Sequence, residues 1–82
     1  MMDEFADMPV VEPGEYEHFK GKRYQVFGVG THSETHEYFV VYKPLYAVPG
    51  RQPDFWVRPY DMFTETVERD GKVIPRFKKV AG

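Results

Sequence analysis

Residues 31–46 read THSETHEYFVVYKPLY, and this stretch decides the fold. Its second half, from Tyr38 to Tyr42, carries aromatic and β-branched residues on both faces, which favours an interior β-strand. Pro44 limits that strand because proline lacks a donor for the ladder. The first half, residues 31–37, is too polar for a core and predicts a loop or a strand end.

The flanking sequence predicts further short strands, separated by tight loops. They cover residues 15–19, 23–29, 55–58, 63–69 and 72–77. Gly28 and Gly30 indicate a bulge or a sharp corner at the end of the second of these. Asp70-Gly71 predicts a two-residue hairpin turn between the last two, and Pro75 makes the final strand an edge.

Two smaller elements complete the prediction. Tyr60-Asp61-Met62 favours a turn or a single helical turn, with Asp61 as its cap. Lys78-Lys79 is expected to be a solvated tail.

About five short strands without a long helix predict an all-β fold. We expect a small, partly open SH3-like barrel over residues 14–80, with an OB-like barrel as the alternative. Residues 1–13 mix acids with two prolines and predict a flexible acidic tail. Aromatic residues make up 17% of the 82-residue chain, and such large side chains let a small domain build a core.

Charge is distributed unevenly along the chain. Residues 1–17 carry six acids and no base, so the remainder holds 11 bases against seven acids, a net of +4. A basic body attracts phosphates, although the same charge is also ordinary for solubility. Without cysteine there is no disulfide framework or thiolate zinc site. With no long apolar run and no signal-peptide pattern, we expect a cytoplasmic protein without membrane contact.

The polar run raises metal binding and hydrolysis as possible chemistry. His32 and His36 stand four residues apart and would meet on a helix, but a strand follows directly. Ser33 sits beside His32, yet adjacent side chains of an extended chain point apart. A simpler interpretation is that the Ser33 and Thr35 hydroxyls bond the local backbone and shape a turn. We therefore predict no catalytic residue, no metal and no cofactor.

An anion site is the third possibility. Arg58 shares a strand face with Trp56, so a guanidinium beside an indole could clamp a carboxylate, a phosphate or a stacked base. Arg76, on the edge strand, could reach the same region. Alternatively, either arginine pairs with Glu34, Glu37 or Glu65 and fixes the barrel.

Six sequence blocks occur in order between Gly14 and Val80. They are Tyr16-x-His18-Phe19-Lys20-Gly21, Tyr24-x-Val26, His32-Ser33-Glu34-Thr35-x-Glu37, Val40-Val41-Tyr42-x-x-Leu45-Tyr46, Trp56-x-Arg58-Pro59-x-x-Met62-Phe63 and Pro75-Arg76-Phe77. Together they resemble the small bacterial domain-of-unknown-function family 1653. The resemblance implies a small all-β, SH3-like bacterial domain, and it carries over no reaction, cofactor or catalytic residue.

The resemblance also implies which residues the motif marks, several of them polar. They are His18, His32, Ser33, Glu34, Thr35, Glu37, Trp56, Arg58, Pro59 and Arg76. We hypothesise that a barrel brings the 31–37 loop, the end of the 55–59 strand and the 72–77 edge to one rim. The expected ligand-binding residues are His32, Ser33, Glu34, Glu37, Trp56, Arg58 and Arg76.

The leading hypothesis is a non-enzymatic binding module for a polar or anionic ligand. Nucleic acid, a peptide or a partner protein would all be compatible. The alternative is a small hydrolase or metal-dependent enzyme that uses His32, Glu34 and His36. A third hypothesis is a homodimer, instead of a monomer, whose seam is the aromatic face of strand 38–42.

Overall fold

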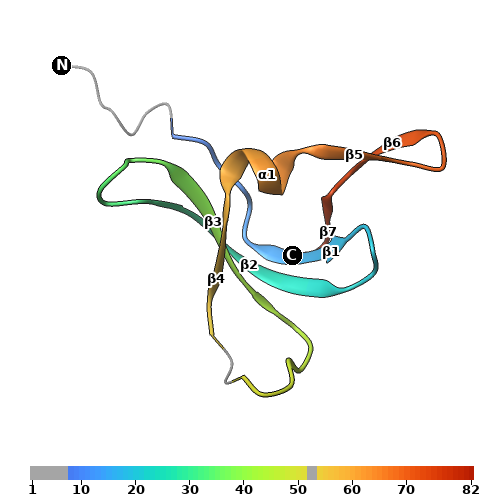
Figure 1. Ribbon diagram of the computed structural model, residues 1–82, viewed down its shortest axis with the longest axis horizontal. Helices are drawn as coiled ribbons and strands as arrows, with labels where there is room; N and C mark the ends of the chain where they lie inside the picture. The colour runs from blue at the N-terminus through green and yellow to red at the C-terminus, as the bar shows by residue number, and fades with distance from the viewer. Residues whose placement is uncertain (1–7, 52–53) are drawn as a thin grey trace.

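The computed structural model describes residues 8–51 and 54–82, and it is built almost entirely from antiparallel strands. The elements are β1 (Gly14–His18), β2 (Arg23–Thr31), β3 (Tyr38–Pro44), β4 (Trp56–Pro59), α1 (Tyr60–Thr64), β5 (Thr66–Arg69), β6 (Lys72–Pro75) and β7 (Phe77–Ala81). Five strands form one sheet in the order β4-β3-β2-β1-β7, and β5 and β6 form a separate hairpin. Figure 1 shows α1 over the twisted sheet and the β5–β6 hairpin projecting beyond it.

The predicted all-β, partly open architecture is confirmed. The five-stranded sheet does not close into a barrel, because its end strands β4 and β7 are not paired with each other in the described part of the chain. The β5–β6 hairpin is a separate sheet. The assignment to the SH3-like type stays a prediction. The acidic tail is described only from Met8 onward, and its first seven residues lie outside the described part. Near its end, Val11 is buried in the core, so this part of the predicted tail packs on the domain.

Alternation along the strands places one face of the sheet in the core. Val26 of β2 and Val40 of β3 are fully buried. The buried set is Val11, Tyr16, Tyr24, Val26, Val40, Tyr42, Phe63 and Phe77. Its rings meet mostly edge to face, and each such pair adds about 0.5–1.5 kcal/mol beyond the area it buries.

The turns follow local backbone chemistry. The β2–β3 register shifts between Val26 and Gly28, which confirms the predicted bulge. Asp70 and Gly71 have φ of 55° and 77°, the left-handed pair that a type I′ hairpin turn needs. This confirms the predicted hairpin between β5 and β6.

Three details of the sequence prediction are wrong. Phe63 belongs to α1 and not to a strand, because burial of its ring against Phe77 outweighs the β-propensity of the threonines that follow. Asp61 does not cap α1; Pro59 occupies the N-cap and no side chain bonds the exposed amides. Lys78-Lys79 is not a solvated tail but part of β7, which pairs with β1 at the edge of the sheet. The lysine side chains are exposed, while their backbone is paired with β1.

Phe63 provides a direct test of this core. Its ring stacks on Phe77 with centroids 4.1 Å apart and planes 6° apart, and it is 2% exposed. Phe63→Ala should lower the free energy of unfolding by about 3–5 kcal/mol, since a buried ring leaves a cavity. Urea titration measures this loss. Val73→Ala on the exposed hairpin should stay within about 0.5 kcal/mol, and an equal loss in both variants would contradict the assigned core.

Candidate anion-binding site

Arg58 and Arg76 project from different elements toward one region beside Phe77. Arg58 lies on β4 with its guanidinium carbon 5.4 Å from the Phe77 ring centroid, and its Nε donates to the Tyr42 hydroxyl at 3.2 Å. Its two terminal nitrogens have no recorded protein acceptor within the described residues. A guanidinium fixed at Nε and over a ring is preorganised to receive an anion at its free end.

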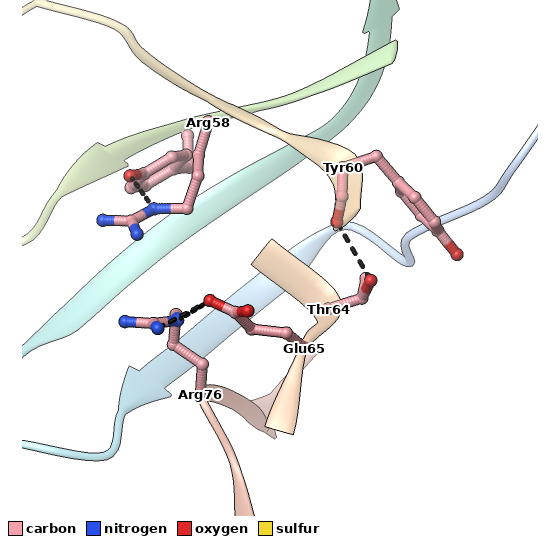
Figure 2. Close-up of polar contacts among 6 residues, drawn as sticks. Arg58, Tyr60, Thr64, Glu65 and Arg76 are labelled. Carbon is pink, nitrogen blue, oxygen red and sulfur yellow. Dashed lines mark hydrogen bonds and ion pairs between the residues drawn. The ribbon is translucent and has the colours of Figure 1, made fainter. Parts of the chain in front are cut away.

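Arg76 lies between β6 and β7 and is held by Glu65. Its Nε and Nη2 both donate to one Glu65 carboxylate oxygen, at 2.9 and 2.6 Å, and its backbone N–H donates to the Glu65 carbonyl at 3.0 Å. Figure 2 shows the guanidinium groups of Arg58 and Arg76 directed toward the same side, with the Glu65 carboxylate beside that of Arg76. Glu65 therefore orients Arg76 through the Nε and Nη2 edge of the guanidinium, and Nη1 has no acceptor among the described residues.

His18 completes the arrangement from the end of β1. Its ring contacts Phe19 and Phe77, with centroid distances of 4.5 and 4.9 Å. Its Nδ1 accepts the backbone N–H of Lys20 at 3.1 Å, so the neutral ring carries its proton on Nε2 and can donate there. Partial burial, followed by the charges of Arg58, Arg76 and Lys20, lowers the pKa of His18 below its ordinary value of about 6.5.

Further cations surround the neighbouring Phe19 ring. Lys20 Nζ, the Arg69 guanidinium and the Arg76 guanidinium lie 5.8, 5.6 and 5.9 Å from its centroid. Arg69 also donates to the Phe19 carbonyl at 2.9 Å. With Arg58 these make four positive groups, and Glu65 is the only carboxylate that the described residues pair with any of them. The local potential is therefore positive, which favours an anion.

Comparison with known proteins places the chain in a family. The model of the family described as "Protein of unknown function (DUF1653)" matches residues 14–79. The chain belongs to this family. It is also similar to the crystal structure of a DUF1653 protein from Bordetella bronchiseptica, with 37% sequence identity and a TM-score of 0.77 over 87% of this chain and 88% of that one. No curated protein matches the chain.

The predicted site residues of this DUF1653 domain fall into separate groups. Four of them, His32, Ser33, Glu34 and Glu37, lie in or beside the turn between β2 and β3, at the end of that hairpin. Within the described residues, no hydrogen bond or ion pair joins this turn to Arg58 or Arg76. The structure thus brings the two arginines to one region and records no contact between them and the turn.

The polar turn is held by its own side chains. His32 Nδ1 accepts the backbone N–H groups of Glu34 and Thr35, both at 3.1 Å. The Thr35 hydroxyl donates to the Glu37 carboxylate at 2.9 Å and accepts the Glu37 N–H at 3.2 Å. This confirms that a hydroxyl of this run, that of Thr35, bonds the local backbone. Across residues 8–51 and 54–82 no group of three His, Cys, Asp or Glu side chains could hold a metal ion, so the hypothesis of a metal-dependent enzyme gains no support.

Trp56 shares the inner face of β4 with Arg58, as predicted, and Tyr42 of β3 contacts both side chains. The centroids of the Tyr42 ring and the indole are 6.1 Å apart, and the Tyr42 hydroxyl accepts a hydrogen bond from Arg58 Nε. The indole N–H donates to Asp54 at 2.9 Å, beside a surface pocket of about 290 Å³ that Trp56 helps to line. The predicted Arg–Glu pairing is confirmed for Arg76 and Glu65 alone among the residues described.

Sequence reasoning missed the supporting residues of the site. Phe77 and Tyr42 position Arg58, and Phe19 gathers the other cations. His18 was marked by the family motif but was not among the expected ligand-binding residues. The adjacency of a histidine and a phenylalanine at the end of β1 was the available signal.

No helix among the described residues is long and apolar enough to span a membrane.

The pKa of His18 reports directly on the two arginines. Arg58→Gln should raise the pKa of His18 toward 6.5, because Arg58 lowers that pKa more than Arg76 or Lys20 does. A ¹H–¹³C NMR titration of the imidazole measures the midpoint. Arg23→Gln removes the same charge from a guanidinium that pairs with Glu15 and Glu17 and is not among the charges that act on His18, so it should leave the midpoint unchanged. A His18 midpoint unaffected by Arg58→Gln would contradict the geometry.

The sign of the linked stability change follows from the same pKa. A lowered pKa means that the unfolded chain binds this proton more readily than the fold does. The contribution of His18 to stability is therefore fully present above about pH 6.5 and decreases as the pH falls toward the folded-state value. His18→Gln should remove this part of the acid destabilisation in pH-dependent urea melts.

Proposed function

We propose that this domain is a binding module that receives an anionic group, a carboxylate or a phosphate, between Arg58, Arg76 and His18. The observation that carries the proposal is the half-buried Arg58, whose guanidinium lies over the Phe77 ring and donates to a neutral hydroxyl, that of Tyr42. Holding an arginine partly out of water without a carboxylate costs free energy. An incoming anion would offset that cost.

The surroundings support an anion in preference to a cation or a neutral ligand. Arg58 and Arg76 offer guanidinium N–H donors, and His18 offers Nε2–H. Carboxylates and phosphates accept such donors in bidentate geometry, and these charge-assisted bonds are stronger than neutral ones. The +4 balance of residues 18–82 would add a weaker, long-range attraction.

The remaining parts of the functional hypothesis follow from the family and the sequence. The short antiparallel strands, the single helical turn after β4 and the strand returning beside β1 are consistent with an SH3-like barrel, a fold type that presents binding surfaces at its rim. The cysteine-free sequence is consistent with a cytoplasmic location.

Isothermal titration of the full chain with inorganic phosphate, citrate and a short single-stranded oligonucleotide tests the proposal. The wild-type chain should bind at least one of the three anions, and Arg58→Gln should weaken that binding by at least ~10-fold, since bonds to charged groups contribute about 1.5–3 kcal/mol. Phosphate or citrate alone would indicate a discrete anion. Oligonucleotide binding that falls steeply with salt would indicate a nucleic-acid backbone.

Arg23→Gln is the matched control, because it removes one exposed guanidinium that is already paired with Glu15. It should leave the affinity within about twofold. An equal loss of affinity in both variants would show that binding depends on the net charge of the chain and not on Arg58, which would contradict the proposed site. Absence of binding for all three probes would contradict the proposal.

A further inference from the structure

The face of the sheet opposite the core is apolar over β2, β3 and β4. Because Val40 and Tyr42 of β3 are buried, Phe39 and Val41 point to the other face. Beside them lie Phe27, Phe55 and Val57, which are 44%, 67% and 60% exposed. We call Phe27, Phe39, Val41, Phe55 and Val57 the outer apolar face.

The pairing register makes these residues one continuous patch. Val41 is paired with Val57 on one side and with Gly28 on the other, and Phe39 is paired with Gly30. The Phe27 and Phe55 rings meet edge to face at 5.3 Å. Scattered exposed apolar side chains are ordinary on a protein surface, but a contiguous patch marks an interaction site.

Glycine keeps this surface open. Gly28 has a φ of 140°, which residues with a side chain rarely adopt. A Cβ built there would meet no described atom within 4 Å, so the position faces open space. With Gly28 and Gly30 on β2, the side chains of Val41 and Phe39 stand uncovered on that flank. The two valines and the aromatic rings therefore present an apolar surface on which a second sheet could pack.

Opposite charges stand at the two ends of the same face. Lys43 of β3 shares the outward alternation of Phe39 and Val41, and its Nζ lies 5.9 Å from the Phe27 ring centroid. Glu37 is exposed and directly precedes β3, where the same alternation continued by one step gives it the outward side. Five residues, 38–42, lie between Glu37 and Lys43, so the two positions are about 20 Å apart along the extended chain. Neither forms an ion pair within the part of the chain described.

We infer that the outer apolar face is a homodimer interface in which two copies stack with their β3 strands antiparallel. A twofold axis through the centre of the face would set Glu37 of each copy against Lys43 of the other while the apolar centres meet. An isologous interface requires this self-complementarity. The inference is independent of the anion site, which lies on the inner face of β4.

Sedimentation velocity of the full chain, from low micromolar to about 1 mM, tests the interface. The wild-type chain should sediment as a dimer at the upper concentrations. Val57→Lys, at an exposed position, should raise the dissociation constant at least ~10-fold because it buries a charge in the apolar centre. Val73→Lys places the same substitution on the β5–β6 hairpin and should leave the dimer intact.

A charge exchange tests the orientation of the two copies. Lys43→Glu should weaken the dimer by opposing two carboxylates, and adding Glu37→Lys should restore it, with an effect that decreases at high salt. A wild-type chain that stays monomeric throughout would overturn the inference and leave the face to a different protein. Equal effects of Val57→Lys and Val73→Lys would also overturn it.

Discussion

Packing around the Phe77 ring is the interaction on which the rest of the structure depends. The ring stacks on Phe63 of α1 and meets Tyr24 of β2 and Tyr42 of β3 edge to face. These contacts join the last strand to the middle of the sheet and to the helical turn. A small domain without disulfides buries a limited area. One ring that contacts residues of α1, β1, β2, β3 and β4 therefore stabilises the arrangement of five elements at once.

The same ring links the core to the candidate site. Arg58 lies over Phe77, His18 contacts its edge, and Arg76 directly precedes it in the chain. The positions of Arg58 and His18 therefore depend on the packing of the core around Phe77. This suits a site that must hold positive groups close together before a ligand arrives.

The strand β4 illustrates how a short sequence serves two surfaces. Its alternation directs Trp56 and Arg58 inward and Val57 outward, with Phe55 just before it on the outer side. The inner residues contribute to the core and the candidate anion site, while the outer ones belong to the proposed dimer face. A one-residue change of register would exchange these roles, so the pairing of β4 with β3 fixes both surfaces together.

Sequence patterns predicted the strands whose side chains alternate and the turns that need special backbone angles. Tyr38–Tyr42, the Gly28 bulge and the Asp70-Gly71 hairpin are of this kind. β7 was missed because its lysines look like a solvated tail, and its pairing with β1 depends on residues some 60 positions away in the sequence. Phe63 was misassigned because its tertiary contact with Phe77 overrides a local preference.

The candidate site shows the same division. Both arginines were predicted as ligand-binding residues from their residue type and motif, whereas their neighbours could not be derived. Glu65 was one of three glutamates predicted as partners for the arginines, and Arg76 forms an ion pair with it in the structure. The polar turn attracted attention by its composition. In the structure the His32 ring and the Thr35 hydroxyl accept backbone N–H groups of the same turn, and Thr35 donates to Glu37, which spacing alone does not reveal.

Side-chain NMR of the two arginines tests the central claim most directly. In a titration with inorganic phosphate, the Arg58 Nε–H resonance and the His18 ring resonances should shift together along one binding curve, and the pKa of His18 should rise because an anion now faces it. Resonances of Phe27 and Val57 on the outer apolar face should stay unmoved. Shifts spread evenly over all exposed arginines and lysines, with the pKa of His18 unchanged, would contradict an anion site at Arg58.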